Sequence, residues 1–367
     1  MKRAGGIRGA DQAAEADQRA AALIIAGGRG TRFWPESRAG RPKPLFALDG
    51  RTSLLSDTIA RLRPPLAADR IFVLASADQR APFRKALRGL LPADNLIVEP
   101  EGRGTAVAIA YGVATIARRR GADTAVVVTP ADHYVTPAAD FRATIAEALG
   151  LARAHDAIVV VGVTPTSAET GYGYQQVGPA VGAGFKVARF VEKPAPAAAR
   201  RMVKSGRYLW NAGIFVMRAG VLAAELRRHA PALAAAMERF GAIGARELPR
   251  YYRGLKFDSF DRELAEKSRN VLGVRARFNW FDVGSWQGLW AALRPAGGAN
   301  VLSGNVIALG ANGVLARGGR RLMVLLGVDD LAVVDTGDAI LIARLSASQE
   351  IRRVTEELAR RGLNRYL

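Results

Sequence analysis

Residues 23–46 read LIIAGGRGTRFWPESRAGRPKPLF, and this stretch decides how the rest of the chain is interpreted. Its first four residues, Leu23–Ala26, are apolar and predict a short buried strand. Gly27, Gly28 and Gly30 follow, and the cations Arg32 and Lys43 come after them. A glycine-rich turn directly after a strand lets backbone N–H groups approach an anion without a Cβ in the way. The stretch therefore predicts a loop that binds phosphate; an ordinary tight turn with surface charges is the alternative.

The spacing excludes two common phosphate-binding motifs. The P-loop pattern G-x-x-x-x-G-K-[ST] does not occur between Gly27 and Lys43. The dinucleotide pattern G-x-G-x-x-G is also absent, because Phe33 stands where the third glycine would be. The stretch instead resembles the signature G-G-x-G-[ST]-R-[LF]-W-P-x-S-R…P-K of sugar-1-phosphate nucleotidylyltransferases. Its portion over residues 33–38 is most similar to the mannose-1-phosphate guanylyltransferase branch.

The composition is that of a folded protein without cysteine chemistry. With 49% hydrophobic residues the chain is not intrinsically disordered, and its apolar runs are too short to span a bilayer, so no membrane partner is expected. Residues 1–20 lack the apolar core of a secretory signal, and we expect a flexible leader there. Because cysteine is absent, a disulfide framework is excluded and the cytoplasm is the expected location.

A formal net charge of +20 raises the question of nucleic-acid binding. The lysines and arginines are dispersed along the chain, however, and no helix-turn-helix, zinc-finger or RNA-platform pattern occurs. We therefore expect no nucleic-acid partner. A basic surface would still attract polyanionic substrates such as nucleoside triphosphates.

Short apolar runs alternate with helical patterns over residues 23–163. The predicted strands are Leu23–Ala26, Ile71–Ala75, Leu96–Val98, Thr124–Thr129 and Ala157–Val163, and the predicted helices are Ser53–Arg63, Gln79–Leu90, Thr105–Arg120 and Ala138–His155. This alternation predicts an α/β fold with a Rossmann-like, mostly parallel central sheet and helices on both faces. Ligands of such sheets bind beyond the carboxyl ends of the strands, where the glycine loop lies.

The pattern changes twice in the second half of the chain. Residues 171–174 and 185–191 predict antiparallel strands placed over one face of the sheet. Beyond Gly297, short apolar pieces separated by Gly, Asn and Asp predict a small β-rich unit, followed by a helix from about Ser348 to Arg361. We expect a leader over residues 1–20, a catalytic domain over 21–296 and a C-terminal domain over 297–367.

Polar residues at strand ends supply further candidate ligands. Asp132 lies in a predicted turn, and Asp282 precedes a glycine turn. Both carboxylates could hold Mg²⁺, although an Asx-turn is the alternative for Asp132. Glu192 and Lys193 end a predicted strand, and their charges could meet sugar hydroxyls and a phosphate. Asn211 offers an amide to further hydroxyls. For the Glu–Lys pair, a solvated surface is the competing interpretation.

The family resemblance covers seven segments in order, from about residue 23 to residue 342, and implies both fold and reaction. The implied fold is the nucleotide-diphospho-sugar transferase type with a short left-handed β-helical extension, which would serve the contacts of a homodimer. The implied reaction transfers GMP from GTP to mannose 1-phosphate, giving GDP-mannose and pyrophosphate, with Mg²⁺ as the cofactor. A phosphate oxygen of mannose 1-phosphate would attack the α-phosphorus in line.

The resemblance also implies a role for each matching residue. The nucleotide would be bound by Gly27, Gly28, Arg29, Gly30, Thr31, Arg103, Gly104, Thr105 and Asp132. The catalytic cations would be Arg32, Lys43 and Lys193; the sugar phosphate would contact Tyr172, Gly173, Glu192, Lys193 and Asn211; and the metal ligands would be Asp132 and Asp282.

Two positions on the nucleotide side depart from the family pattern. Gly104 stands where the pattern has Asn, and Pro44 follows Lys43 where this branch has Gln. Two alternatives therefore stay open. One is the same reaction with another nucleotide or sugar, such as glucose 1-phosphate; the other is a non-catalytic regulator that binds a nucleotide-sugar.

Overall fold

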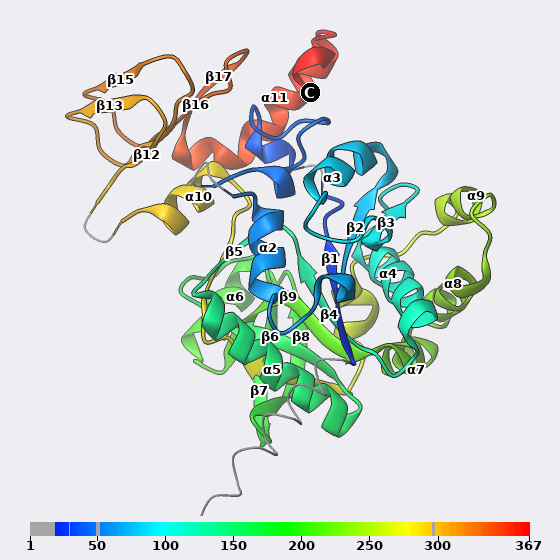
Figure 1. The fold of residues 1–367 in the computed structure, drawn as a ribbon. Helices are drawn as coiled ribbons and strands as arrows, with labels where there is room; N and C mark the ends of the chain where they lie inside the picture. Colours follow the sequence, from blue (N-terminus) through cyan, green and yellow to red (C-terminus); the bar gives the residue numbers. More distant parts are fainter. Residues whose placement is uncertain (1–18, 29, 49–51, 296–297) are drawn as a thin grey trace, which may run out of the picture.

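Nine strands form the central sheet of the computed structural model, which describes residues 19–28, 30–48, 52–295 and 298–367. Their order across the sheet is β3-β2-β1-β4-β9-β6-β10-β8-β7 (Figure 1). The strands are β1 (Ala20–Ile25), β2 (Ile71–Ser76), β3 (Leu96–Glu99), β4 (Ala125–Pro130), β6 (Ile158–Val163), β7 (Gly173–Val181), β8 (Gly184–Glu192), β9 (Tyr208–Arg218) and β10 (Val271–Arg275). Most of the expected leader lies outside the described residues, but its last residue, Ala20, begins β1.

The α/β class is confirmed, although the sheet is mixed. Strands β3, β2, β1 and β4 are parallel neighbours, as are β6 and β10. Strand β9 lies between β4 and β6 and runs antiparallel to both. No strand was predicted over residues 208–218, and the alternation of side chains would not have given its direction.

The hairpin β7–β8 corrects one expectation. It does not lie over a face of the sheet but extends its edge, because β8 pairs antiparallel with β10. Strand β7 in turn pairs with β9, with Tyr174 opposite Trp210. An in-plane position satisfies the backbone hydrogen bonds of β10, which would otherwise form an exposed sheet edge.

Helices cover both faces of the sheet. One face carries α2 (Leu54–Leu62), α3 (Arg80–Ala86), α5 (Ala138–His155) and α6 (Pro196–Lys204); the other carries α4 (Thr105–Arg120), α7 (Ala219–His229), α8 (Pro231–Ala242) and α9 (Leu248–Arg253). Strand β1 contributes Ala22 and Ile24 to the first core and Ala21 and Leu23 to the second. Burial on both sides explains its uninterrupted apolar sequence.

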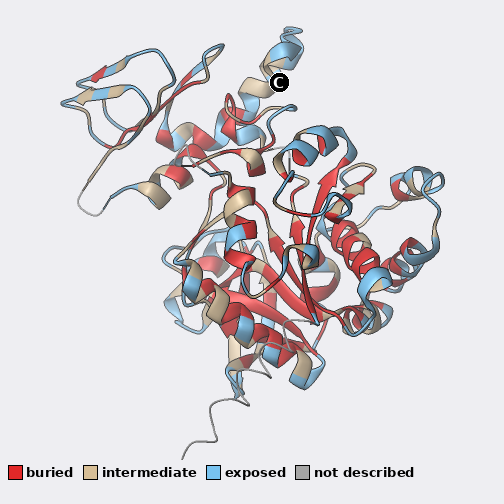
Figure 2. Cartoon of the chain, in the orientation of Figure 1, coloured by how far each residue is buried: buried red, intermediate tan, exposed pale blue. Residues whose placement is uncertain are grey.

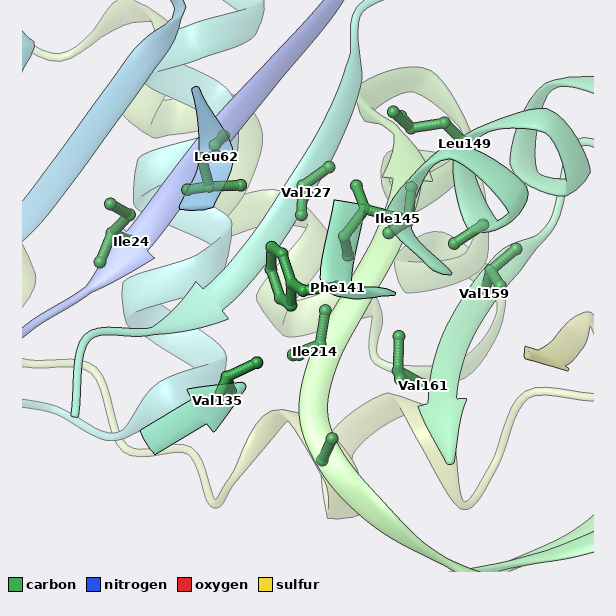
Figure 3. Packing of buried hydrophobic residues seen from close by; sticks show 14 of the residues in the cluster. Ile24, Leu62, Val127, Val135, Phe141, Ile145, Leu149, Val159, Val161 and Ile214 are labelled. Carbon is green, nitrogen blue, oxygen red and sulfur yellow. The ribbon is translucent and has the colours of Figure 1, made fainter. Parts of the chain in front are cut away.

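The packing of these cores follows the alternation of the strands. Figure 2 shows buried residues concentrated in the sheet and on the helix sides that face it. In the close-up of Figure 3, Phe141 and Ile145 of α5 lie over Val127 of β4 and Ile214 of β9. Helix α2 begins as expected after Ser53, whose hydroxyl oxygen accepts a hydrogen bond from the backbone N–H of Ser56 at 3.1 Å.

A separate two-stranded sheet lies near the carboxyl ends of the parallel strands. It pairs β5 (His133–Thr136) with β11 (Asn279–Asp282) in antiparallel register. The pairing sets His133 opposite Asp282. Helix α10 (Trp286–Leu293) follows β11 after a short glycine turn and leads toward the C-terminal unit.

The C-terminal unit consists of short strands stacked in successive turns of the chain. The strands are β12 (Val301–Ser303), β13 (Val306–Leu309), β14 (Leu315–Arg317), β15 (Met323–Leu326), β16 (Leu331–Asp335) and β17 (Ile340–Arg344). Strands β12, β14 and β16 form one parallel stack, and β13 with β15 forms a second. This arrangement confirms a β-helix-like extension. A short helical turn, η7 (Leu345–Glu350), and helix α11 (Ile351–Arg360) complete it.

The C-terminal unit shares a core with the segment that opened the sequence. Phe33 and Trp34 pack in one apolar cluster with Trp286 of α10, Leu345 of η7 and Ile351 of α11. Figure 1 shows α11 running alongside the early part of the chain that precedes α2. Within the described residues, none of the helices combines the length and hydrophobicity that a membrane crossing needs.

Candidate active site

A cavity of about 400 Å³ opens at the carboxyl ends of β1 and β4. Its polar and glycine lining residues include Gly28, Gly30, Arg32, Lys43, Thr105, Asp132, His133, Asp261, Asp282 and Gly284. The cavity therefore lies at the sheet edge where the sequence pattern predicted a ligand site. It brings the glycine loop together with both candidate metal carboxylates.

Gly30 and Lys43 are in direct contact. Gly30 has φ +60°, and a Cβ built on it would lie 2.4 Å from the Cβ of Lys43. A side chain at residue 30 would therefore be both strained and in collision with Lys43. The absence of that side chain lets Lys43 approach the loop closely, where it is 5% exposed.

The Lys43 ammonium forms an ion pair with Asp132. Its Nζ lies 2.7 Å from Oδ2 of Asp132 and 5.4 Å from the ring centroid of Phe33. Burial alone would raise the pKa of Asp132, but the charge of Lys43 and the hydrogen bond from it lower that pKa below its usual value. Asp132 is therefore a carboxylate near neutral pH, with its second oxygen not engaged by Lys43.

His133 is held as a neutral imidazole. Trp280 donates its indole N–H to Nδ1 of His133 at 3.1 Å, so the imidazole proton lies on Nε2. Burial, the largest cause, lowers the pKa of His133, while the carboxylates of Asp132 and Asp282 oppose the shift. A neutral imidazole held by an indole N–H is consistent with a structural role for His133.

Asp132 and Asp282 line the same cavity because β5 pairs with β11. Asp132 immediately precedes β5, and Asp282 is the last residue of β11, opposite His133. Among the residues that the structure describes, no cluster of three or more metal-ligating side chains occurs. Two carboxylates suit Mg²⁺, which binds hard oxygen ligands and is usually completed by water and substrate phosphates. The donor set therefore fits that metal.

Only some residues of the glycine loop line the cavity. Gly28, Gly30 and Arg32 line the cavity, whereas Gly27 and Thr31 do not. A Cβ on Gly27 would lie 2.7 Å from Oε1 of Glu99, so this glycine allows close packing behind the loop. The predicted contact of Arg29 lies outside the described residues.

The guanidinium of Arg32 reaches toward the C-terminal unit. It is exposed, and its Nη1 donates a hydrogen bond of 2.7 Å to Oε1 of Gln349 in η7. It also lies beside Gly284, because a Cβ on that glycine would be 3.8 Å from Nη1. Arg32 therefore lies between the turn that follows Asp282 and the C-terminal unit.

The segment before α4 explains one departure from the family pattern. Gly104 caps α4 with φ +88° and ψ 162°, a conformation that almost only glycine adopts. Thr105 lines the cavity, and its hydroxyl accepts a hydrogen bond from the backbone N–H of Phe260 at 3.0 Å. Arg103 instead donates to Glu101 at 2.9 Å and does not line the cavity. Pro44, the second departure, lines it.

The predicted sugar-binding residues form a group beside the cavity. A Cβ on Gly173 would lie 2.7 Å from Oε2 of Glu192 and 3.3 Å from Cβ of Asn211, so the three are neighbours. Lys193 has φ +48°, a strained value for a residue with a side chain, and its Nζ lies 3.1 Å from Oε1 of Glu192. Tyr172 lines an adjacent cavity of about 470 Å³ that also contacts Asp282.

Asn211 is already engaged by the protein. Its amide nitrogen donates to Oδ1 of Asp261 at 2.7 Å, and its oxygen accepts from the backbone N–H of Gly213 at 3.0 Å. One amide hydrogen and one oxygen lone pair are left for a ligand. Asn211 itself does not line the main cavity; its partner Asp261 does.

Asp261 had no role in the sequence interpretation. It begins a five-residue π-helical turn, η6 (Asp261–Ala265), and faces the main cavity. Burial and the charge of Glu192 raise the pKa of Asp261 to about 7. A carboxylate near a helix start is commonly a cap, so nothing in the sequence distinguished this residue.

A second buried carboxyl group lies behind the glycine loop. Burial raises the pKa of Glu99 to about 7, although the hydroxyl of Tyr252 donates to its Oε2 at 2.6 Å and opposes the shift. These two residues are 153 positions apart. The Glu99–Tyr252 pair packs behind Gly27. No local sequence pattern predicted this hydrogen bond.

With this geometry in view, comparisons with known proteins identify the family. The sequence profile described as "Nucleotidyl transferase" matches residues 21–296. The chain belongs to the nucleotidyl transferase family. A second profile, "MannoseP isomerase/GMP-like beta-helix domain", matches residues 304–358. This family contains the enzymes that the signature over residues 23–46 resembles, so the expected membership is confirmed.

Individual relatives show which members of the family the chain is similar to. The xanthan biosynthesis protein XanB of Xanthomonas campestris is 35% identical over 93% of this chain and 73% of its own. The mannose-1-phosphate guanylyltransferase of Escherichia coli K12 is 34% identical over 94% of this chain and 74% of its own. A crystal structure from Thermus thermophilus, described as a mannose-1-phosphate geranyltransferase, has TM-score 0.84 and 36% identity, covering 93% of this chain and 99% of that one.

Proposed function

We propose that the protein transfers GMP from GTP to mannose 1-phosphate, giving GDP-mannose and pyrophosphate. The observation that carries the proposal is the single cavity that joins Gly30, Arg32 and Lys43 to the carboxylates of Asp132 and Asp282. Relatives at 33–35% identity over more than nine-tenths of the chain bear the name mannose-1-phosphate guanylyltransferase or act in xanthan biosynthesis. The catalytic domain would comprise residues 21–296 and the C-terminal domain residues 297–367.

The reaction requires alignment of two polyanions more than it requires a protein nucleophile. An oxygen of mannose 1-phosphate forms a bond to the α-phosphorus of GTP, and the bond from that phosphorus to the bridging oxygen of the β-phosphate breaks. Pyrophosphate leaves with the electron pair. Because the attacking oxygen is already anionic, the protein supplies positioning and charge neutralisation.

Each cation in the site has a place in this alignment. Lys43 lies against the glycine loop and would contact the α-phosphate, where negative charge passes from one bond to another. Arg32 would hold the β- and γ-phosphates, because it stands at the open side of the cavity next to Gly284. Lys193, beside Glu192, would meet the phosphate of the sugar.

Asp132 and Asp282 would hold Mg²⁺. When bound, that ion would offset the negative charge of the phosphates on both substrates. Asp132 is suited to the role because its lowered pKa keeps it ionised. The Lys43 ion pair occupies only one carboxylate oxygen and fixes the orientation of the other.

Mannose would be seated by Gly173, Glu192 and Asn211, with Asp261 fixing the Asn211 amide. Gly173 allows the close approach of the Glu192 carboxylate, because a Cβ on residue 173 would lie 2.7 Å from its Oε2. Carboxylate and amide groups suit the vicinal hydroxyls of a sugar. The use of GTP, a nucleotide of the cell interior, agrees with the proposed cytoplasmic location.

The protein would act as a homodimer joined through the C-terminal unit. In the described residues, the large apolar side chains that are exposed all belong to this unit: Leu302, Ile307, Leu309, Leu322, Val324, Leu326, Ile340, Ile342 and Leu363. A second copy of the same surface would bury them across a two-fold axis. Light scattering should give twice the chain mass, and Leu326→Lys combined with Ile342→Lys should give monomer; a monomeric wild type would refute the dimer.

A substrate panel tests the proposed reaction. The purified chain is incubated with Mg²⁺, each of the common nucleoside triphosphates and each of several sugar 1-phosphates, and pyrophosphate release is measured. We expect the highest kcat/KM with GTP and mannose 1-phosphate. A higher value with another pair would reassign the substrates. No turnover with any pair, together with tight GDP-mannose binding, would favour the non-catalytic regulator.

A further inference from the structure

The C-terminal unit holds the signature loop through hydrogen bonds at three successive points. Gln349 accepts from Arg32 at 2.7 Å, and the backbone carbonyl of Tyr366 accepts from the indole N–H of Trp34 at 2.8 Å. Further along the loop, Arg38 donates to both carboxylate oxygens of Asp338, at 2.6 and 2.8 Å. These contacts join residues about 300 positions apart or more, so they exist only in the folded chain.

The helical turn η7, which contains Gln349, also contacts helix α10. Ser348, the neighbour of Gln349, is buried, and its hydroxyl oxygen accepts from the backbone N–H of Gln287 at 3.2 Å. Gln287 lies in the first turn of α10, immediately after the turn that presents Asp282. Two consecutive residues of η7 therefore contact both the loop of Arg32 and the helix that follows that turn.

An apolar core keeps these contacts in register. Phe33, next to Arg32, packs its ring 4.9 Å from that of Trp286, and both belong to a cluster with Leu345 and Ile351. Phe33, Trp286 and Leu345 are each 5% exposed or less. Because packed cores move little, η7 is held at a defined distance from the loop. Gln349 therefore acts from a rigid base although its own side chain is exposed.

The chemistry of the amide suits an arginine that must still bind phosphate. A guanidinium carries five N–H donors, and the bond to Gln349 uses one of them, on Nη1. Glutamine is neutral, so it orients the guanidinium without reducing the positive charge. A carboxylate at this position would orient Arg32 equally well but would compete with phosphate for it.

We propose that Gln349 is a positioning residue for Arg32, through which the C-terminal unit aligns that guanidinium for the leaving pyrophosphate. The inference rests on the proposed function, in which Arg32 binds the β- and γ-phosphates. A free arginine side chain samples many rotamers, and all except the bound one are lost when a ligand binds. The hydrogen bond to Gln349 restricts them beforehand, so less conformational entropy is lost when the phosphates arrive.

The test measures the reverse reaction, in which pyrophosphate is a substrate. Gln349→Ala should raise the KM for pyrophosphate, and that for GTP in the forward direction, by about five-fold, the effect of one hydrogen bond. The KM for mannose 1-phosphate should not change. Gln349→Glu should raise the KM for pyrophosphate further, since it adds a negative charge beside the binding arginine. The matched control is Gln287→Ala, an exposed glutamine on α10 whose backbone contact to Ser348 is kept.

Variants of Arg32 separate this inference from the proposed function. If Arg32→Ala leaves the KM for pyrophosphate unchanged, the phosphate role of Arg32 in the proposed function is wrong. If Arg32→Ala raises that KM while Gln349→Ala does not, the positioning role alone is overturned. In the Arg32→Ala background, Gln349→Ala should have no further effect on KM. A full additional effect there would show that Gln349 acts on the site without Arg32, and would also overturn the proposal.

Discussion

Gly30→Ala places a methyl group where Lys43 already lies. The added Cβ would be 2.4 Å from the Cβ of Lys43 and 2.9 Å from the hydroxyl oxygen of Ser37. Relief to ordinary van der Waals contact, which begins at 3.4 Å, requires Lys43 and the loop to separate by about 1 Å. The backbone at residue 30, with φ +60°, adds a strain of about 1–2 kcal/mol for alanine.

The shift should reduce catalysis more than it reduces stability. A displacement of about 1 Å at a catalytic group costs roughly 100-fold in rate, so kcat/KM for GTP should fall by about that factor. The free energy of unfolding should fall by about 1–2 kcal/mol. The assay is pyrophosphate release at saturating mannose 1-phosphate, with urea unfolding of the same preparations to measure stability.

Gly40→Ala is the matched control for this substitution. Gly40 lies in the same loop, but a Cβ on it would meet nothing within 4 Å, and its φ is not in the left-handed region. Its kcat/KM should stay within about threefold of wild type, roughly 0.6 kcal/mol. A folded Gly30→Ala variant with activity in that same range would refute the argument that Gly30 sets the position of Lys43.

Three further substitutions test the site. Asp132→Asn should lower kcat by at least about 100-fold with unchanged circular dichroism, because an amide is a poor Mg²⁺ ligand and leaves Lys43 unpaired; near-normal turnover would remove the metal role. Lys193→Ala should raise KM for mannose 1-phosphate about ten-fold and leave that for GTP unchanged, whereas equal changes would place Lys193 elsewhere. Asp261, whose pKa is raised to about 7, stays protonated when folded while the unfolded chain ionises above about pH 4. Wild type should therefore lose stability relative to Asp261→Asn as pH rises from about 4 to about 7, by up to about 1.4 kcal/mol per pH unit in urea titrations; parallel pH profiles would contradict this.

Local patterns predicted the parts of the fold that local physics controls. Strands β1 and β4 appear as apolar runs because both of their faces are buried, and α5 is found within its predicted bounds. A turn after β1 could be predicted because closely spaced glycines follow the apolar run, and Gly30 does adopt φ +60° there. The direction of β9 and the in-plane position of β7–β8 could not be predicted, since alternation of side chains is the same in either direction.

The structure explains one of the two departures from the family pattern. Gly104 is explained by a backbone conformation that nearly excludes other residues, a constraint that could be seen only once φ and ψ were known. Pro44 lines the cavity next to Lys43, and its effect on base selectivity stays a question for the substrate panel. Residue type and spacing thus gave a set of candidate site residues, whose roles stay predictions, but did not reveal the contacts among them.

By itself the sequence determined the signature loop, the order of the segments and the kinds of groups that could bind two phosphorylated substrates. These follow from propensity and from motif spacing, which act over a few residues. Only the tertiary structure decided which distant groups come together: Asp282 and Asp132 line one cavity through the β5–β11 pairing, and Gln349 accepts a hydrogen bond from Arg32 across 317 positions. Such contacts depend on how whole apolar faces pack, and many sequences satisfy that packing without a pattern that a short window can display.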